Sequence, residues 1–179
     1  SSNSVSFVNI GDQGHVFGVE MEFRKDLYQN NNTRIYTFLN GTYLNTNQDL
    51  DREKVVAETT TSYSNTISID PSTSSDKMQG ASDFLANVNL GFEQKWGSQN
   101  SLDLVVSYSH ISDNIYAIGY ASKGNLVDKA INVLDAVAKV KFANGIGFSI
   151  SGKNLLNPSF KRVQENSNGD VSVRDYKKG

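Results

Sequence analysis

Cysteine is absent from the 179 residues of this chain, which excludes disulfides, thiolate catalysis and cysteine-ligated metals. Long hydrophobic runs are absent too, since no stretch of about 18 apolar residues exists, and this excludes a transmembrane helix. Strong charge of one sign is also lacking. The net charge is -2 and the sequence pI is about 5.6, so the chain has no basic footprint of a nucleic-acid-binding protein. The first six residues, 1–6, lack the charged and apolar regions of a signal peptide, so we expect none in this chain.

Alternation of apolar and polar residues is the main feature that is present. Only 37% of the residues are hydrophobic and the mean hydropathy is -0.43, yet apolar residues recur at every second position in several segments of about ten residues. A period of two indicates β-strands, because successive side chains of a strand point to opposite faces. The predicted strands are Phe17 to Arg24, Thr33 to Thr46, Phe84 to Trp96, Leu102 to Ser109, Leu134 to Phe142 and Ile146 to Ser151. In the second of these, Tyr36 and Phe38 compete with Ile35 and Leu39 for the apolar face, and the sequence does not assign the register.

The connections between the predicted strands alternate between short and long. Short turns of favoured turn residues are predicted at 29–32, 97–100 and 144–145. Long polar connections are predicted at 47–82, at 119–132 and from 157 to 179. Outer-membrane barrels have this alternation, with tight turns at the periplasmic end and long loops at the extracellular end. The sequence therefore predicts an all-β fold, an antiparallel up-and-down meander that forms part of a large transmembrane β-barrel.

The polar positions of these strands are predicted to share one side of the sheet. Such a side faces bulk water in a soluble sandwich and a hydrated lumen or a plug in a large barrel. Periodicity alone does not separate these environments. In the barrel, Trp96 and Tyr108 are candidate interfacial aromatics. The predicted polar set is Glu20, Glu22, Asn87, Asn89, Glu93, Asp103, Ser107, Ser109, Asp135, Lys139 and Lys141.

Candidate catalytic and metal-binding residues give weak patterns. His110 with Asp103 and Ser107 or Ser109 is a conceivable hydrolase arrangement, but positions two apart on one strand stand about 7 Å apart, beyond hydrogen-bond reach. The series Asn45, Asn47, Asp49 and Asp51 is faintly like a Ca²⁺ loop, but the glycine and glutamate that such a loop needs are replaced by Leu50 and Val56. We therefore predict no enzyme activity, no catalytic residue, no metal site and no cofactor.

Four local patterns resemble the C-terminal part of the barrel of TonB-dependent outer-membrane receptors, in a style similar to receptors of Bacteroidota. Their order and spacing cover nearly the whole chain. The segments are Asn9 to Gly11 followed by Gly18 to Glu22, like an "N-x-G … G-V-E-x-E" strand; Phe84 to Phe92 with Leu102 to Ile111, like the next hairpin; Gly152 to Pro158, like an "NLL/NLF" segment; and Arg174 to Gly179, like an "R-x-Y-x-x-G" stretch.

The resemblance implies an outer-membrane transporter that imports a scarce nutrient and has no covalent chemistry. In that family a plug domain and TonB supply the coupling, the barrel contacts outer-membrane lipid, and extracellular loops capture the ligand. Tyr63, Tyr116 and Tyr120 lie in or near the long connections and are the candidate ligand-binding residues. The transported ligand and a surface lipoprotein partner are left open.

The resemblance is partial, because the family's barrels have 22 strands, a plug with a TonB-contacting segment and a final strand that ends in an aromatic residue. About six strands and none of these other features are visible here, so we expect residues 1–179 to form a partial barrel segment without a plug domain. The alternative is a soluble all-β binding or adhesion module, such as a lipocalin-like barrel or a sandwich. That alternative predicts a dry interior lined by Phe17, Val88, Leu104 and Phe148.

Overall fold

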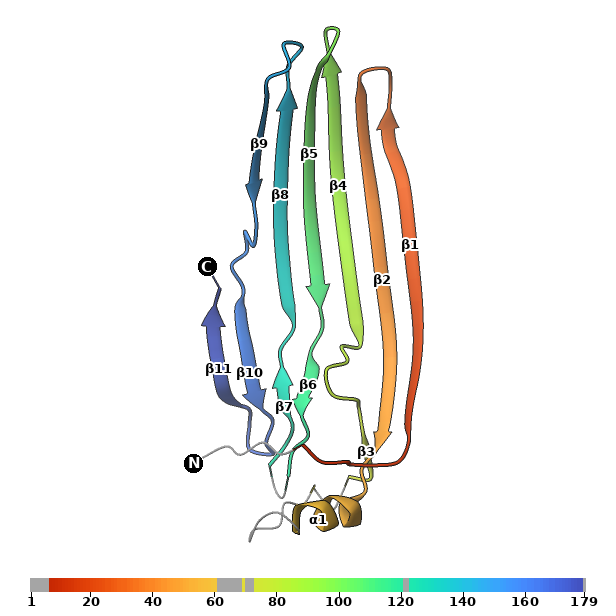
Figure 1. Cartoon of the computed structure of the whole chain (residues 1–179), viewed down its shortest axis with the longest axis vertical. Helices are drawn as coiled ribbons and strands as arrows, with labels where there is room; N and C mark the ends of the chain where they lie inside the picture. The colour runs from red at the N-terminus through yellow and green to blue at the C-terminus, as the bar shows by residue number, and fades with distance from the viewer. Residues whose placement is uncertain (1–6, 61–68, 70–72, 121–122, 179) are drawn as a thin grey trace.

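The fold is all-β, as predicted, but it also contains one short helix that was not predicted (Figure 1). The computed structural model describes residues 7–60, 69, 73–120 and 123–178. The larger sheet contains six long strands in the order β1-β2-β4-β5-β8-β9, and neighbouring strands are antiparallel. These strands are β1 (Gly14–Gln29), β2 (Thr33–Asp49), β4 (Phe84–Trp96), β5 (Asn100–Ile111), β8 (Ile131–Lys141) and β9 (Gly147–Gly152).

Short hairpin turns connect β1 to β2, β4 to β5, and β8 to β9, and all three lie at the same end of the sheet, at the top of Figure 1. Gly97 and Gly145 have φ values of 61° and 85° in two of these turns. A side chain disfavours this left-handed region, so glycine is the residue that the tight turns require. The predicted separation of short and long connections to opposite ends is confirmed.

The strand register places the predicted polar set on one face. Residues directly opposite each other in an antiparallel pair share a face, and Asn87 lies opposite Ser109 while Glu93 lies opposite Asp103. The same face continues through Glu22 opposite Asn40 at one side and Asp103 opposite Lys139 at the other. We call this the polar face and the other the apolar face.

The register of β2 decides the competition that the sequence left open. Ile35 lies opposite Phe92 and Leu39 opposite Val88, so both belong to the apolar face. Tyr36 therefore lies on the polar face, where its ring covers Gly91 on β4 and the guanidinium of Arg34 lies 4.6 Å from the ring centre. Phe38 also lies on the polar face, 4.6 Å below the guanidinium of Arg24. Two aromatic rings are thus accommodated among polar residues because an arginine covers each.

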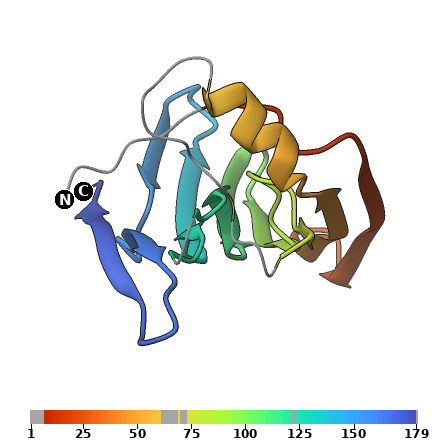
Figure 2. The same ribbon diagram turned by 90° about the horizontal axis from the view of Figure 1, so that it is seen from below.

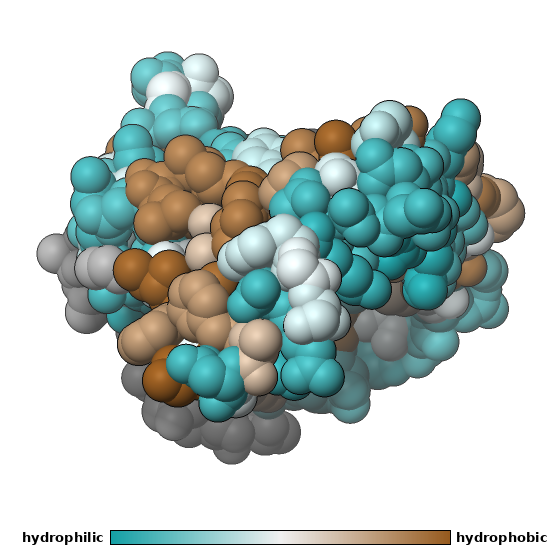
Figure 3. Space-filling model, turned by 90° about the horizontal axis from the view of Figure 1, so that it is seen from above, coloured by the Kyte–Doolittle hydropathy of each residue, from teal (hydrophilic) through white to brown (hydrophobic). Residues whose placement is uncertain are grey.

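The apolar face has no second layer over it in the described part of the chain. Phe17 is 65% exposed, Val88 41% and Phe148 64%, so the dry interior that a soluble module requires of these residues is not formed here. Figure 3, viewed from the hairpin-turn end, shows exposed hydrophobic residues (brown) next to exposed hydrophilic residues (teal). Two charged residues of the six described strands lie on the apolar face: Lys25 on the edge strand β1, opposite Thr37, and Asp49 at the last position of β2.

The long connections differ from the loops that we predicted, because they contain regular structure. The connection after β2 contains the helix α1 (Arg52–Thr60) and the two-residue strand β3 (Ser75–Asp76), which pairs with β2. A smaller sheet, in the order β11-β10-β7-β6, contains β6 (Asn114–Ala117), β7 (Leu126–Asp128), β10 (Ser159–Gln164) and β11 (Val171–Lys177). The sequence did not predict these elements because they are short and lie in polar connections, and because β3 and β7 pair with the distant strands β2 and β10.

The buried hydrophobic side chains lie at the end of the molecule opposite the hairpin turns. Leu50, Val55 and Ile69 form one cluster, and Val8 and Ile10 pack against it. Seen from below, β1 and β11 lie far apart on either side and the sheet is an open, curved layer (Figure 2). The only appreciable core among the described residues thus holds the long connections together, whereas the long strands are held by their backbone ladders.

Candidate functional site

The N-terminal segment and α1 form one wall of a cavity at the end of the sheet where the long connections meet. Asp51 caps the helix, because its carboxylate accepts a hydrogen bond of 3.1 Å from the backbone N–H of Lys54. The Lys54 ammonium in turn pairs with Asp12, and the carboxylate of Glu58 accepts hydrogen bonds of 2.9 and 3.1 Å from the backbone and side-chain amides of Asn9. These contacts fasten the segment before β1 to the helix after β2.

The cavity has a volume of about 280 Å³, near the lower end of the range for small-molecule sites. Tyr116 and Tyr120, two of the three predicted ligand-binding residues, both line it, and Gln79 and Gln164 add side-chain amides. The third candidate, Tyr63, lies outside the described residues. The rest of the described lining is mainly apolar and comprises Phe7, Val8, Ile10, Val55, Ile69, Ala117, Ile118, Gly119, Gly124 and Leu126. A lining of this kind favours a ligand with an apolar surface and a few hydrogen-bonding groups.

A charged pair across the smaller sheet holds Tyr116 in place. The Arg162 guanidinium donates two hydrogen bonds, of 2.6 and 2.9 Å, to the carboxylate of Asp128 on the neighbouring strand β7. Its carbon lies 3.2 Å from the centre of the Tyr116 ring, which leaves the opposite side of that ring uncovered by this contact. Hydrogen bonding to Asp128 raises the pKa of Arg162 above its ordinary value, although partial burial opposes the shift. The bidentate pair keeps the guanidinium in a fixed plane against the ring.

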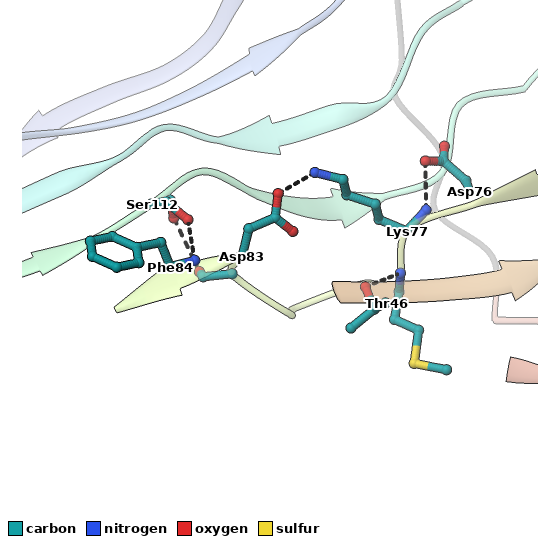
Figure 4. Close-up of polar contacts among 8 residues, drawn as sticks. Thr46, Asp76, Lys77, Asp83, Phe84 and Ser112 are labelled. Carbon is teal, nitrogen blue, oxygen red and sulfur yellow. Dashed lines mark hydrogen bonds and ion pairs between the residues drawn. The ribbon is translucent and has the colours of Figure 1, made fainter. Parts of the chain in front are cut away.

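A second set of polar contacts fastens the segment before β4 to the ends of β2 and β5 (Figure 4). The hydroxyl of Thr46 accepts a hydrogen bond of 3.1 Å from the backbone N–H of Met78. Lys77 pairs with Asp83, and the hydroxyl of Ser112 accepts a hydrogen bond of 3.0 Å from the backbone N–H of Phe84. The segment at 76–84 is therefore held in place at several points.

Asn125 links this segment to the connection that carries Tyr120. Its amide nitrogen donates a hydrogen bond of 2.6 Å to the carboxylate of Asp76, and its oxygen accepts one of 2.8 Å from the backbone N–H of Gly119. Tyr120 itself forms a single antiparallel bridge with Ile69. The three long connections thus share one hydrogen-bonded and apolar assembly, and the cavity lies within it.

The hydrolase arrangement considered from the sequence is wrong in its geometry. His110 lies opposite Ala86 and Asn132, so it belongs to the apolar face, where its Nδ1 is 2.7 Å from the side-chain oxygen of Asn132. Asp103 and Ser107 lie on the other face of the same strand. The sequence alone predicts this separation, because His110 is at an even position of the strand and Asp103 and Ser107 are at odd positions.

The possible Ca²⁺ series is accounted for by other roles. Asn45, Asn47 and Asp49 belong to strand β2, and Asp51 caps α1. In the part of the chain that the structure describes, no group of three or more histidine, cysteine, aspartate or glutamate residues is arranged to hold a metal.

Sequence reasoning missed the contact between Asp128 and Arg162. The two residues are 34 positions apart, and no local period relates them. Asp128 and Arg162 lie opposite each other only because β7 pairs with β10. The sequence does not predict that pairing, so it gave no usable signal for this contact.

Comparison with protein-family models, with curated proteins and with solved structures gave no match to this chain. None of the described helices is long and apolar enough to cross a membrane.

Proposed function

We propose that this chain forms part of the wall and the extracellular mouth of an outer-membrane transporter of the TonB-dependent type. In this proposal the apolar face contacts lipid, the polar face contacts a hydrated lumen or a plug, and the cavity bordered by Tyr116 and Tyr120 contributes to ligand capture. The observation that carries the proposal is the uncovered apolar face, because large exposed apolar patches mark sites of contact with a membrane or a partner.

The dimensions of the apolar face agree with a bilayer. Its alternation in β4 runs from Phe84 to Trp96, which is roughly 40 Å of strand at about 3.4 Å per residue. A tilt of about 35–45°, typical of membrane barrels, reduces this to roughly 28–33 Å along the membrane normal, enough for an apolar band of about 25 Å with an aromatic residue at each border. Tyr108, the other predicted interfacial aromatic, lies inside this range opposite Val88.

The strand edges and one lysine place further requirements on the proposal. In the described chain no strand pairs with the outer edges of β1 and β9, and unpaired backbone groups cost several kcal/mol each in hydrocarbon. A closed barrel needs at least about eight strands, so the proposal includes further strands at both edges. Lys25 lies on the apolar face near one of these edges, and its long side chain reaches toward the headgroups.

Cysteine labelling tests the proposal directly, because the chain has no cysteine of its own. Ser167→Cys lies in the β10–β11 turn, at the end with the long connections, and Ser98→Cys lies in the β4–β5 turn at the opposite end. In intact cells we expect a membrane-impermeant maleimide to label Ser167→Cys and to label Ser98→Cys only after the envelope is opened. Val88→Cys, on the apolar face, should resist the reagent in both conditions.

The outcome that contradicts the proposal is equal labelling of both turn positions in a protein that stays in solution without detergent. That result would favour the soluble binding module instead. Ready labelling of Val88→Cys by the water-soluble reagent would count against lipid contact in the same way.

A further inference from the structure

The β10–β11 hairpin places two positive charges directly opposite each other. Arg162 on β10 pairs in register with Arg174 on β11, and like charges at opposite positions destabilise a strand pair. Asp128 neutralises Arg162 through the bidentate contact. The described part of the chain provides Arg174 with no ion pair, and its guanidinium carbon lies 4.7 Å from the centre of the Tyr176 ring. One of the two opposed charges is therefore uncompensated.

Arg174 borders a groove of about 230 Å³ with an aromatic floor. Phe160 and Tyr176, both on its lining, are stacked on each other with their ring centres 5.4 Å apart and their planes 21° apart. A cation lies over each ring, since the ammonium of Lys178 is 4.3 Å from the centre of the Phe160 ring and Arg174 lies over Tyr176. Arg162 lines the groove as well, and Ser112 and Asn114 add a hydroxyl and an amide. The groove therefore combines a guanidinium that has no ion pair among the described residues, hydrogen-bonding groups and two stacked rings that hold cations beside it.

The groove opens on the side of the polar face. Its lining includes Ile111 and Ile131, which lie opposite each other in the pairing of β5 with β8 and share their face with Asp103 and Lys139, an even number of positions away. Arg162 lies between this groove and the cavity, since its guanidinium is stacked on Tyr116. A ligand that occupies the cavity thus has a cationic groove next to it.

We propose that this groove binds an anionic group of the captured ligand, a carboxylate or a phosphate, through Arg174, whose guanidinium the ring of Tyr176 holds beside the groove. Guanidinium groups bind both kinds of oxyanion in a bidentate manner. Arg174 suits this role better than Arg162, whose hydrogen-bonding edge is occupied by Asp128. The inference rests on the proposed function for the ligand's route to the groove, but anion binding is measurable without transport.

Arginine modification by phenylglyoxal, mapped by mass spectrometry on the full protein in detergent, tests the inference. The probes are inorganic phosphate, acetate and benzoate, and the matched control is Arg52, an exposed arginine on α1. For a single site at twice the dissociation constant of the anion, we expect modification of Arg174 to slow by about threefold, with no change at Arg52. Protection by phosphate above both carboxylates identifies phosphate as the group bound, and protection by acetate and benzoate above phosphate identifies a carboxylate.

The variant Tyr176→Leu removes the ring over which Arg174 lies. It should reduce the protection of Arg174 by every anion, because the guanidinium is no longer held beside the groove. The inference is overturned if no anion slows modification of Arg174 more than that of Arg52. This result is distinct from failure of the proposed function, which appears in the labelling of the two turn positions and leaves anion protection unaffected.

Discussion

Replacing Val106 and Val105 in turn by arginine tests which solvent contacts the apolar face. The two valines are neighbours on β5 but lie on opposite faces. Val106 lies opposite Leu90 near the middle of the apolar band, and Val105 lies opposite Gly91 on the polar face. The substitution is identical in both cases, so the difference between the variants reports the surroundings of each face.

The structure provides the expected magnitudes. Val106 is 43% exposed, so if water covers it, Val106→Arg should change the free energy of unfolding by no more than about 0.5 kcal/mol. If lipid covers it, an arginine near the bilayer midplane should cost about 2–4 kcal/mol. Val105 is half-buried and has Asp103 on the same side of its strand, so Val105→Arg should cost about 1 kcal/mol or less in a hydrated lumen.

Denaturant unfolding of the protein in phospholipid vesicles measures both changes, with the fluorescence of Trp96 as a reporter, since this chain has no other tryptophan. Lipid contact predicts that Val106→Arg is the more damaging variant by at least about 1 kcal/mol. Exposure alone predicts the reverse order, because Val105 is the less exposed of the two. Equal costs, or a larger cost at Val105, would refute the assignment of the apolar face to lipid.

Two further predictions concern packing and pH. A Cβ atom at Gly91 would lie 2.1–2.6 Å from ring atoms of Tyr36, whereas one at Gly41 has its nearest contact at 3.7 Å. Gly91→Ala should therefore lower the free energy of unfolding by about 1–3 kcal/mol, and Gly41→Ala, the control, should leave it nearly unchanged. Equal effects of the two substitutions in a denaturant titration would contradict the role of the Tyr36 ring. Hydrogen bonding to Asp113 raises the pKa of Lys129 above the ordinary lysine value of 10.5, so this contribution is fully present below that pH and is lost as the pH rises through the raised value. The difference in unfolding free energy between the protein and Lys129→Met should stay constant up to about pH 10 and shrink above it, and a pH-independent difference would refute the link.

Strand positions and faces followed from the sequence because they depend on local periodicity. Val88 and Asn89 alternate in a segment where one face is apolar and the other polar, and a shift of one residue would exchange the two faces. Turn residues such as Gly97 likewise act on their immediate neighbours. The six strands, their polar face and the common end of the short turns were therefore all predictable.

The register of β2 depended on residues elsewhere in the chain. Tyr36 and Ile35 satisfy the strand pattern equally well by themselves. Gly91, on a different strand, provides the space that the Tyr36 ring covers, and Arg34 covers the ring in turn. No window of sequence around β2 contains Gly91, so local alternation was insufficient there.

The sequence by itself determined an amphipathic antiparallel sheet with long connections at one end, since alternation and turn chemistry act over a few residues. The tertiary structure alone decided that these connections fold into α1 and a second sheet, that Tyr116 and Tyr120 line one cavity, and that Arg162 pairs with Asp128 while Arg174 does not. Contacts of this kind join residues tens of positions apart, and their geometry is set by strand pairing and bulges. Forming these contacts requires long loops to close, and no local sequence pattern predicts which segments then meet.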